Sequence, residues 1–403
     1  MQTRKKPVIL LVAEAVTLAH FARIVTLAKA LDTSTYEVVV ASDPRYANLE
    51  APLDCAFHPI RSIPSAEFAH ALARGKPLYS VETLTHYVED DLALFDSIKP
   101  DLVVGDFRLS LAVSAPLRKI PYASVVNAYW SPYADIAYPI PDLPITQLLG
   151  VPLAQKIFDV VRPITFALHA RPLNQLRRRY NLPLLGRDLR TVYSWGDYTL
   201  YADVPELVPT RPLPANHRYL GSLLWSTNTA LPEWWTSLPK SKPVVLLTLG
   251  SSGRTDLLPM VLSALSELPI TVIVATAGKI DLADVPANVF VADYLPLDIT
   301  TRQASLVICN GGSLTTYQAL AFGVPVLGIC SNMDQLLNMS AIERLGAGVL
   351  VRAACARPAQ LKEAVRTLLE TAAYTQAAKL AGEHFRQIDA GQRFRAFVSE
   401  LFG

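Results

Sequence analysis

The sequence predicts two α/β domains, each built around an open sheet of parallel strands. At 403 residues the chain is too long for one ordinary core, since single cores stop growing near about 250–300 residues. In both halves, short apolar runs alternate with segments of helical spacing, a pattern typical of parallel strands joined by helices. A proline-rich stretch without a hydrophobic period, residues 205–242, separates the halves and is interpreted as an interdomain linker.

The N-terminal domain, predicted over residues 1–204, begins with a β-α-β unit. Residues 8–12 form an apolar run, residues 18–31 show helical spacing, and residues 36–41 form a second, β-branched run. The next clear strand ends at Asp106, and a helix and a further apolar strand follow it. This order predicts a doubly wound sheet in the N-terminal half.

The C-terminal domain, predicted over residues 243–385, repeats the same rhythm of strand, loop and helix. Its predicted strands are the apolar runs at residues 244–249, 271–275, 289–292, 306–309 and 324–329. We expect the last residues, 386–403, to form a helix that packs back on the N-terminal domain. The two halves therefore share a layout.

Composition excludes several classes of function. Hydrophobic residues make up 51% of the chain, yet its apolar runs are far shorter than the roughly 20 residues that span a bilayer. A formal net charge of +2 supplies neither a basic field for nucleic acid nor an electrostatic reason for membrane binding. The basic N-terminus lacks a signal cleavage site, so we expect a cytoplasmic protein. Four widely separated cysteines suggest neither zinc nor a disulfide framework.

The most informative stretch runs from Asn310 to Asn338 and begins where a predicted strand ends. Gly311 and Gly312 let backbone N–H groups approach a ligand, and the following residues open a helix whose positive dipole end favours an anion. These features predict a phosphate-binding turn. The alternative is a glycine turn followed by an ordinary capping box made by Thr315 and Gln318.

The continuation of this stretch resembles the nucleotide-sugar-dependent family-1 glycosyltransferases, the UDP-glycosyltransferase superfamily, and above all its bacterial natural-product and macrolide members. The pieces that match the family signature, in the family's order and spacing, are Asn310-Gly311-Gly312, Thr315, Gln318-Ala319-Leu320, Gly323-Val324-Pro325, Asp334-Gln335 and Asn338. The linker segment 219–225 and residues 248–252 are similar to further family segments, as are residues 293–297. The resemblance implies a GT-B fold, in which two Rossmann-like open parallel-sheet domains face each other across a cleft.

Carried over residue by residue, the resemblance implies a donor site in the C-terminal half. The residues implied to hold the diphosphate are Ser251, Asn310, Gly312, Ser313 and Thr315. Those implied to line the nucleobase and ribose are Tyr294, Leu295, Pro296 and Gln318. Asp334 and Gln335 would hydrogen-bond the hydroxyls of the sugar, which suits a carboxylate acceptor beside an amide.

Three residues depart from the family pattern. Asn310 replaces a histidine, so it can donate a hydrogen bond to the diphosphate but cannot carry a charge. Leu314 stands where bacterial members often have glycine, and Gln318 stands where many have glutamate. Donor identity, UDP-sugar or dTDP-sugar, therefore stays open.

The N-terminal half supplies a candidate general base. His20 follows the first strand at the start of the first helix, which is the position of the family's base, and Asp106 matches the aspartate that orients it. A free imidazole has a pKa of about 6.5, so it is mostly neutral and can accept a proton near pH 7. A structural histidine and a helix-capping aspartate are the alternatives.

The acceptor side is predicted from aromatic content. The tract 129–144 is dense in Tyr, Trp and Pro and lacks a regular period, so it reads as an irregular loop, with Tyr129, Trp130 and Tyr133 as pocket residues. Residues 57–79 are expected to add apolar walls. Such a pocket would take a small, largely apolar or aromatic acceptor.

The resemblance implies an inverting displacement in which His20 takes the proton of the acceptor hydroxyl. The nucleotide sugar is a substrate in this mechanism, and neither a cofactor nor a metal ion is expected. We expect a monomer or homodimer without nucleic-acid partners or a transmembrane segment. Two alternatives remain at this point: a nucleotide-sugar epimerase or hydrolase, and a non-catalytic nucleotide-sugar-binding protein on the same fold.

Overall fold

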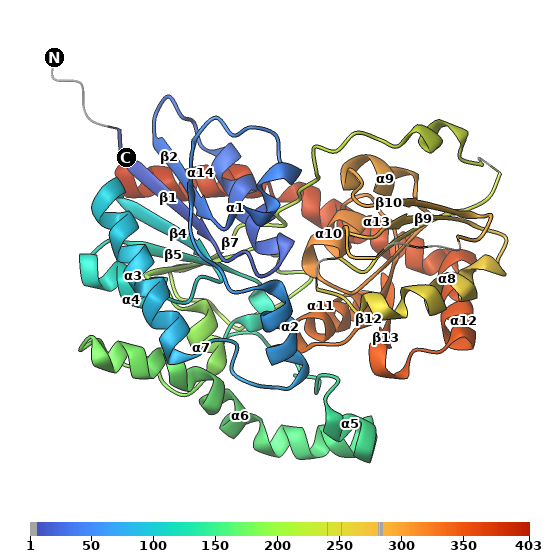
Figure 1. Ribbon diagram of the computed structural model, residues 1–403, viewed down its shortest axis with the longest axis horizontal. Helices are drawn as coiled ribbons and strands as arrows, with labels where there is room; N and C mark the ends of the chain where they lie inside the picture. Colours follow the sequence, from blue (N-terminus) through green and yellow to red (C-terminus); the bar gives the residue numbers. More distant parts are fainter. Residues whose placement is uncertain (1–5, 240, 251, 281, 283–284) are drawn as a thin grey trace. The chain divides into compact units, whose positions relative to one another are not determined.

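A computed structural model of the chain describes residues 6–239, 241–250, 252–280, 282 and 285–403. These residues form two compact units, each with its own parallel sheet (Figure 1). Of the described residues, those within 6–136, 155–223 and 388–403 belong to the first unit, and those within 137–154 and 224–387 belong to the second. The fold is therefore the predicted pair of α/β, Rossmann-like domains.

The first sheet has seven parallel strands in the order β3-β2-β1-β4-β5-β6-β7. Its strands are β1 (Val8–Ala13), β2 (Glu37–Ser42), β3 (Ala56–Pro59), β4 (Leu102–Asp106), β5 (Tyr122–Val126), β6 (Tyr198–Tyr201) and β7 (His217–Tyr219). The helices of this unit are α1 (Leu18–Ala30), α2 (Ser65–Ala73), α3 (Val81–Ile98), α4 (Leu111–Arg118), α6 (Val151–Arg179), α7 (Leu189–Ser194) and α14 (Ala390–Phe402). The first four residues of α6 belong to the second unit.

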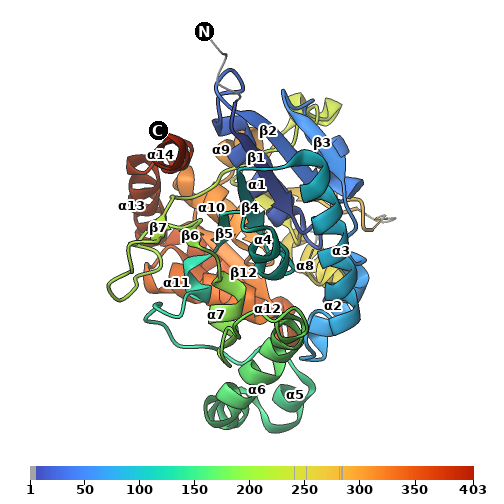
Figure 2. The ribbon, with the colours of Figure 1, turned by 90° about the vertical axis from the view of Figure 1, so that its left-hand side faces the viewer.

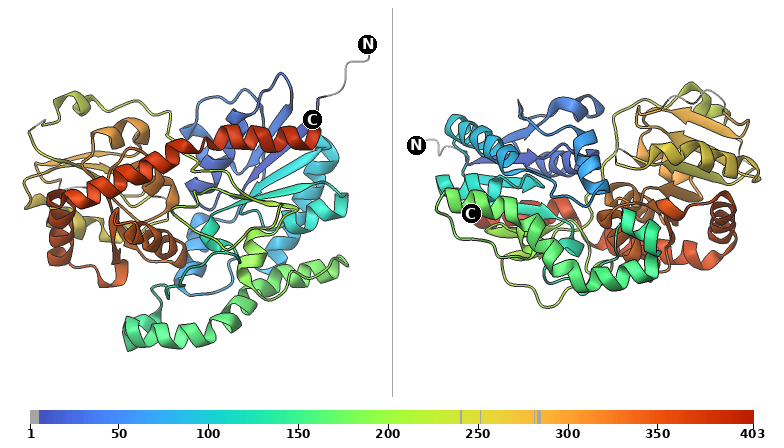
Figure 3. Two further views of the ribbon diagram at one scale, coloured as in Figure 1. Left: turned by 180° about the vertical axis from the view of Figure 1, so that it is seen from behind. Right: turned by 60° about the horizontal axis from the view of Figure 1, so that its bottom comes forward.

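Alternate side chains of β1 are buried on opposite faces of this sheet, because successive side chains of a strand point to opposite sides. Ile9 and Leu11 join a core with α1 and with Phe394 of α14. Leu10 and Val12 join a second core with Phe95 of α3. Figure 2 shows α3 and α14 on opposite sides of the sheet, and Figure 3 shows α14 lying across the first unit from behind. The sheet is therefore buried on both faces, as expected for parallel strands.

The second sheet has six parallel strands in the order β10-β9-β8-β11-β12-β13. Its strands are β8 (Val244–Thr248), β9 (Thr271–Ala275), β10 (Val289–Ala292), β11 (Leu306–Cys309), β12 (Val326–Cys330) and β13 (Gly348–Arg352). The helices of this unit are α5 (Pro144–Leu149), α8 (Leu258–Ser266), α9 (Leu297–Gln303), α10 (Ser313–Ala321), α11 (Met333–Arg344), α12 (Pro358–Glu370) and α13 (Ala372–Gln387).

The boundaries between the units differ from the predicted ones in two places. The stretch predicted as a linker contains β7, so the first unit extends to Leu223. Residues 137–154, predicted in the N-terminal domain, belong to the second unit. Asp142 holds them there, because its carboxylate accepts hydrogen bonds from Arg352 Nη1 at 3.0 Å and from the Ala354 N–H at 2.9 Å.

Candidate active site

The predicted base and its partner meet at the carboxyl edge of the first sheet. His20 lies in the first turn of α1, which follows β1, and Asp106 is the last residue of β4. Because β1 and β4 are parallel neighbours with Ala13 opposite Asp106, the two segments end at the same edge. His20 Nδ1 lies 2.7 Å from Asp106 Oδ1. The juxtaposition that the sequence predicted is therefore present.

The geometry assigns the tautomer of His20. Asp106 is buried, and burial alone raises a carboxyl pKa, but the charges of Arg23 and His20 outweigh it and hold the pKa of Asp106 below its ordinary value. Nδ1 lies 2.7 Å from Asp106 Oδ1 and 3.0 Å from Arg23 Nη2, which can only donate. The shorter contact is with an ionised carboxylate, which only accepts, so we assign the hydrogen to Nδ1 and Nδ1 donates to Asp106. Nε2 then keeps a lone pair and has no partner among the described residues. The imidazole is 15% exposed, so a substrate proton can reach it.

Arg23 completes the site and was not predicted. Its guanidinium grips Asp106 with two bonds, Nε to Oδ2 at 2.6 Å and Nη2 to Oδ1 at 2.9 Å. This bidentate geometry fixes the carboxylate plane and so fixes His20 as well. Arg23 lies three residues after His20 on the same face of α1, but this spacing alone does not predict that its guanidinium is buried against Asp106.

A buried polar chain extends from Arg23 along the strand ends. Arg23 Nη1 donates to Asn127 Oδ1 at 2.5 Å, and Asn127 Nδ2 donates to Asp203 Oδ1 at 3.2 Å. Asn127 follows β5 and Asp203 follows β6, so the chain connects the ends of three neighbouring strands. Because these hydrogen bonds link neighbouring strand ends, they make the sheet edge that carries Asp106 rigid.

An aromatic cluster surrounds the other side of His20. The ring of Phe107 stacks on the imidazole with centroids 4.9 Å apart and an interplanar angle of 6°. Phe107 adopts a left-handed φ of 58°, which is uncommon for a residue with a side chain. Phe68, Tyr79 and Tyr193 pack around the same ring at 5.3–6.3 Å. The imidazole of His20 therefore lies beside an apolar, aromatic wall.

The three predicted pocket aromatics occupy different environments. Trp130 contacts Tyr193 with centroids 5.2 Å apart, so it joins the cluster around Phe107. Tyr133 packs against His217 instead, at 5.3 Å. Tyr129 is 0% exposed, so a ligand reaches its side chain only if neighbouring groups move. Trp130 is thus linked through Tyr193 and Phe107 to His20.

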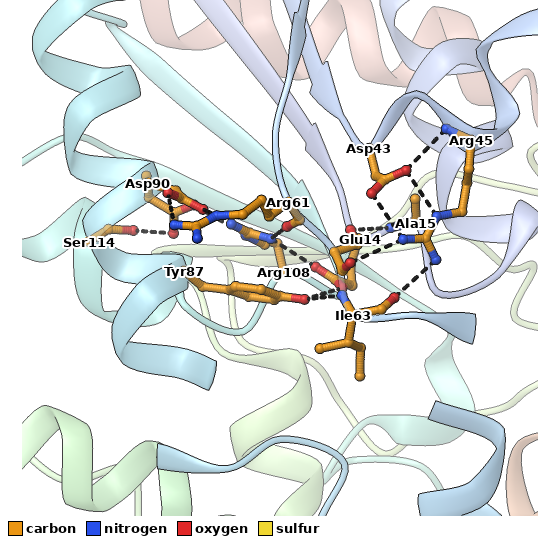
Figure 4. Close-up of polar contacts among 12 residues, drawn as sticks. Glu14, Ala15, Asp43, Arg45, Arg61, Ile63, Tyr87, Asp90, Arg108 and Ser114 are labelled. Atoms are coloured by element: carbon orange, nitrogen blue, oxygen red, sulfur yellow. Dashed lines mark hydrogen bonds and ion pairs between the residues drawn. The ribbon is translucent and has the colours of Figure 1, made fainter. Parts of the chain in front are cut away.

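A second buried charged cluster stabilises the end of β4. Arg108 is fully buried; its Nη1 donates to Glu14 Oε2 at 3.1 Å and its Nε donates to Asp91 Oδ1 at 3.2 Å. Figure 4 shows Arg108 between Glu14 and the ring of Tyr87, whose hydroxyl also donates to Glu14 at 2.9 Å. Burial raises the pKa values of Glu14 and Asp91, and Arg108 opposes this rise.

This cluster also helps to position the His20–Asp106 pair. Arg108 directly follows Phe107, and the Glu14 N–H donates to the Asp106 carbonyl at 3.0 Å. The backbone on both sides of the left-handed Phe107 is thus held, which offsets the cost of its conformation. This cluster could not be predicted from sequence, because its members are far apart along the chain.

The glycine turn of the second unit follows β11 and precedes α10. Gly311 has φ of 85°, and a Cβ there would lie 2.5 Å from the Cys330 sulfur, so only glycine fits. Asn338 Nδ2 donates to the Gly311 carbonyl at 2.8 Å and to Thr316 Oγ1 at 2.8 Å. Asn338 of the family signature is therefore a structural clamp for this turn.

Asn310 makes two hydrogen bonds that bridge two loops. Its Nδ2 donates to Ser252 Oγ at 3.1 Å, and its Oδ1 accepts the Gly312 N–H at 3.1 Å. A diphosphate that uses the Gly312 N–H would have to displace this side chain. Ser251 lies outside the described residues.

Ser313 and Thr315 lie in the first turn of α10, where backbone N–H groups lack intrahelical partners. The half-buried Leu314 lies between them. The helix terminus therefore retains the donors and the dipole direction that an anion needs, although the Gly312 N–H is already engaged.

The residues predicted near the nucleobase and ribose are partly buried. Leu295 and Pro296 are buried where α9 begins, and the Tyr294 hydroxyl donates to the Ala277 carbonyl at 3.0 Å. Gln318 is 2% exposed, and its Oε1 has no hydrogen-bond partner among the described residues. An unsatisfied buried acceptor costs free energy, and a ribose hydroxyl would satisfy it.

The predicted sugar-binding pair opens α11, and its two members differ. Gln335 forms a capping box with Asn332: its N–H donates to Asn332 Oδ1, and its Oε1 accepts the Ser331 N–H at 2.9 Å. Its acceptor oxygen is thus occupied, while Nε2 has no partner within the described part of the chain. Asp334 is half-buried one position earlier. Gln335 can therefore offer a sugar a donor only.

None of the helices among the described residues combines the length and apolar character needed to cross a bilayer. No cluster of three or more His, Cys, Asp or Glu side chains in the same part of the chain is arranged to hold a metal ion.

Comparisons with known proteins identify the family. The family model for the C-terminal domain of erythromycin biosynthesis protein CIII-like proteins matches residues 259–387. The chain is 53% identical over 377 residues to a PGL/p-HBAD biosynthesis rhamnosyltransferase of Mycobacterium bovis (strain BCG / Pasteur 1173P2), an alignment that covers 94% of this chain and 84% of that protein.

Solved structures show the same fold. Spinosyn forosaminyltransferase SpnP has a TM-score of 0.71 at 19% identity, with 98% of this chain and 99% of that chain covered. Spinosyn rhamnosyltransferase SpnG complexed with thymidine diphosphate has a TM-score of 0.67 at 20% identity, with 98% and 100% covered. Together with the mycobacterial relative, these matches show that the chain belongs to the family-1 nucleotide-sugar glycosyltransferases of GT-B fold and is a glycosyltransferase.

Proposed function

We propose that this glycosyltransferase moves a rhamnose-type deoxysugar from a thymidine diphosphate donor to a hydroxyl of a small, largely apolar or aromatic acceptor, with inversion and without a metal ion. The observation that carries the proposal is the His20–Asp106 pair, which leaves Nε2 as an acceptor beside the Phe107 cluster. The name of the mycobacterial relative supports the sugar, and the thymidine diphosphate complex of SpnG supports the nucleotide.

In the proposed step, His20 Nε2 takes the proton of the acceptor hydroxyl as its oxygen attacks the anomeric carbon. The bond from that carbon to the diphosphate oxygen breaks, and its electron pair leaves with the diphosphate. Asp106, held by Arg23, stabilises the imidazolium that forms. The helix dipole and N–H groups at the start of α10 would take up the charge of the leaving group.

The aromatic cluster supports the class of acceptor. Phe68, Tyr79, Phe107, Trp130 and Tyr193 form a connected set of rings that reaches His20. Such rings favour flat, apolar or aromatic molecules, which bury large areas without charged partners. A phenol is the simplest acceptor of this kind, because it joins a ring to a hydroxyl.

The first test is transfer itself. We expect dTDP-rhamnose and a hydrophobic phenol to give a rhamnoside whose anomeric configuration is opposite to that of the donor, with equal rates in EDTA and in Mg²⁺. Liquid chromatography with mass spectrometry measures product, and NMR assigns the anomer. A reaction with donor alone is the control, because release of free sugar or an epimer there would indicate a hydrolase or epimerase. Retention of configuration, or loss of rate in EDTA, would contradict the mechanism.

A second test concerns Asn310. We expect Asn310→His to weaken nucleoside diphosphate binding at both pH 6 and pH 8, because the buried amide bonds Ser252 and Gly312 simultaneously and a larger ring cannot replace both contacts. Calorimetric titration with dTDP measures the affinity. Tighter binding at pH 6 than in the wild type would mean that the ring simply adds a charge-assisted hydrogen bond to the diphosphate.

A further inference from the structure

The largest gathering of exposed apolar side chains lies on α6. Twelve large apolar residues are exposed in the described part of the chain; six of them lie on α6, and Leu148 and Leu149 precede it closely. We define the apolar stripe as Ile157, Val160, Val161, Ile164 and Leu168, with exposed fractions from 37% to 77%. Single exposed apolar residues need no explanation, but a contiguous patch marks an interaction site.

The stripe occupies one face of the helix. Its residues follow Leu153, also exposed, at offsets of 4, 7, 8, 11 and 15, which is the spacing of one helical face. The opposite face is buried through Phe158, Phe166, Ala170 and Leu173. The stripe is therefore a second apolar face, directed away from the one that anchors the helix.

Polar contacts fix α6 in this orientation. Arg177 donates through Nη1 to the Ala112 carbonyl and through Nε to the Pro183 carbonyl. The His169 ring nitrogen Nε2 lies 3.1 Å from the Gly75 carbonyl. Figures 1 and 2 both place α6 beyond α7, away from the sheet of the first unit. The helix is anchored, and its outer face is free to meet a partner.

The charge on α6 is strongly positive. The helix carries six Lys or Arg residues and a single acid, Asp159, an excess of five positive charges, whereas the whole chain has a net charge of +2. Arg178 and Arg179 lie 18 residues, or five turns, after Val160 and Val161, so they extend the face of the stripe. Lys156, Arg171, Arg178 and Arg179 are exposed.

We propose that α6 docks the protein on an anionic lipid surface. The stripe would enter the boundary between headgroups and acyl chains, and Arg171, Arg178 and Arg179 would meet lipid phosphates, as in interfacial amphipathic helices. A second copy of the chain fits this face less well, because a symmetric contact would place two positively charged helices together. The inference is independent of the proposed transfer reaction, since it uses none of its residues.

The test is flotation of the full chain with vesicles. We expect binding to vesicles of phosphatidylglycerol mixed with phosphatidylcholine, weaker binding to phosphatidylcholine alone, and loss of binding as salt rises. Val160→Ser combined with Ile164→Ser should lower the affinity for anionic vesicles at least tenfold. Arg178→Gln combined with Arg179→Gln should lower it by about twenty-five-fold, because each basic residue near an anionic surface contributes roughly a factor of five.

The matched control replaces exposed apolar residues elsewhere. Ile299→Ser combined with Leu380→Ser removes two exposed apolar side chains, 40% and 55% exposed, from the second unit and should leave vesicle binding unchanged. Unchanged thermal unfolding of the stripe variant shows that its fold is intact. The proposal is overturned if the wild type does not float with anionic vesicles at low salt, or if the stripe variant floats equally well. A dimer in light scattering that the stripe variant abolishes, without vesicle binding, would identify a second copy as the partner.

Discussion

Replacing His20 by alanine is expected to lower the rate of sugar transfer by about a hundredfold to ten-thousandfold, the range contributed by a positioned general base. With Nδ1 bonded to Asp106, the imidazole Nε2 is the acceptor that we assign to the substrate proton. Nucleoside diphosphate binding should change little, because its proposed contacts come from the turn before α10. Steady-state kinetics measures the first quantity and calorimetry the second.

The matched control for this prediction is His86→Ala. His86 is an exposed histidine of the same unit, on α3, and should leave both rate and affinity unchanged. Asp106→Asn should lower the rate without removing the imidazole, because an amide cannot stabilise the imidazolium as a carboxylate does. Near-normal turnover in His20→Ala would remove His20 from the mechanism.

The meeting of His20 and Asp106 could be predicted because parallel strands place their carboxyl ends at one edge. The residues around the pair could not. Arg23 reads as one more charged residue on a surface helix, and its burial depends on a partner 83 residues away. Phe107 could not be predicted as the stacking partner of His20, since a left-handed backbone at a residue with a side chain has no local signature.

Some strands could likewise be predicted from the sequence and others could not. Long β-branched runs such as β1 and β8 were predicted, because burial on both faces leaves a continuous apolar run. Shorter strands at or near the sheet edges were missed: β7 has only three residues, His217–Tyr219, and all are partly exposed. Such a strand is defined by pairing with its neighbour, so its sequence resembles that of a loop.

A local motif can serve more than one purpose. The Asp334-Gln335 pair was assigned to sugar binding, and the structure also makes Gln335 the closing residue of a helix cap.

The net charge of the whole chain was a poor guide to its surface. A total of +2 gave no reason to consider a membrane surface, yet it conceals a helix with an excess of five positive charges. A summed charge carries no information on where the charges lie.

Replacing Arg108 by methionine is expected to destabilise the first unit by about 3–5 kcal/mol, the usual cost of breaking a buried ion pair from one side. Methionine keeps much of the apolar bulk of arginine, but it leaves Glu14 and Asp91 buried without a positive partner. The urea concentration at half-unfolding measures the loss. Arg61→Met is the control, because its exposed pair with Asp90 should leave the midpoint unchanged.

The loss should depend on pH in a definite direction. Burial already raises the pKa values of Glu14 and Asp91, and removal of Arg108 raises them further. Unfolded carboxyl groups lose their protons at about pH 4, whereas Glu14 and Asp91 of the folded variant keep theirs to higher pH. Above about pH 4 the folded variant therefore holds more protons than the unfolded chain, so its stability falls as pH rises. The difference from the wild type should be smallest near pH 5 and largest near pH 8. Adding Glu14→Gln to Arg108→Met should recover part of the stability at pH 8. If Arg108→Met instead loses the same stability at pH 5 and pH 8, then lost packing, not uncompensated charge, is the cause.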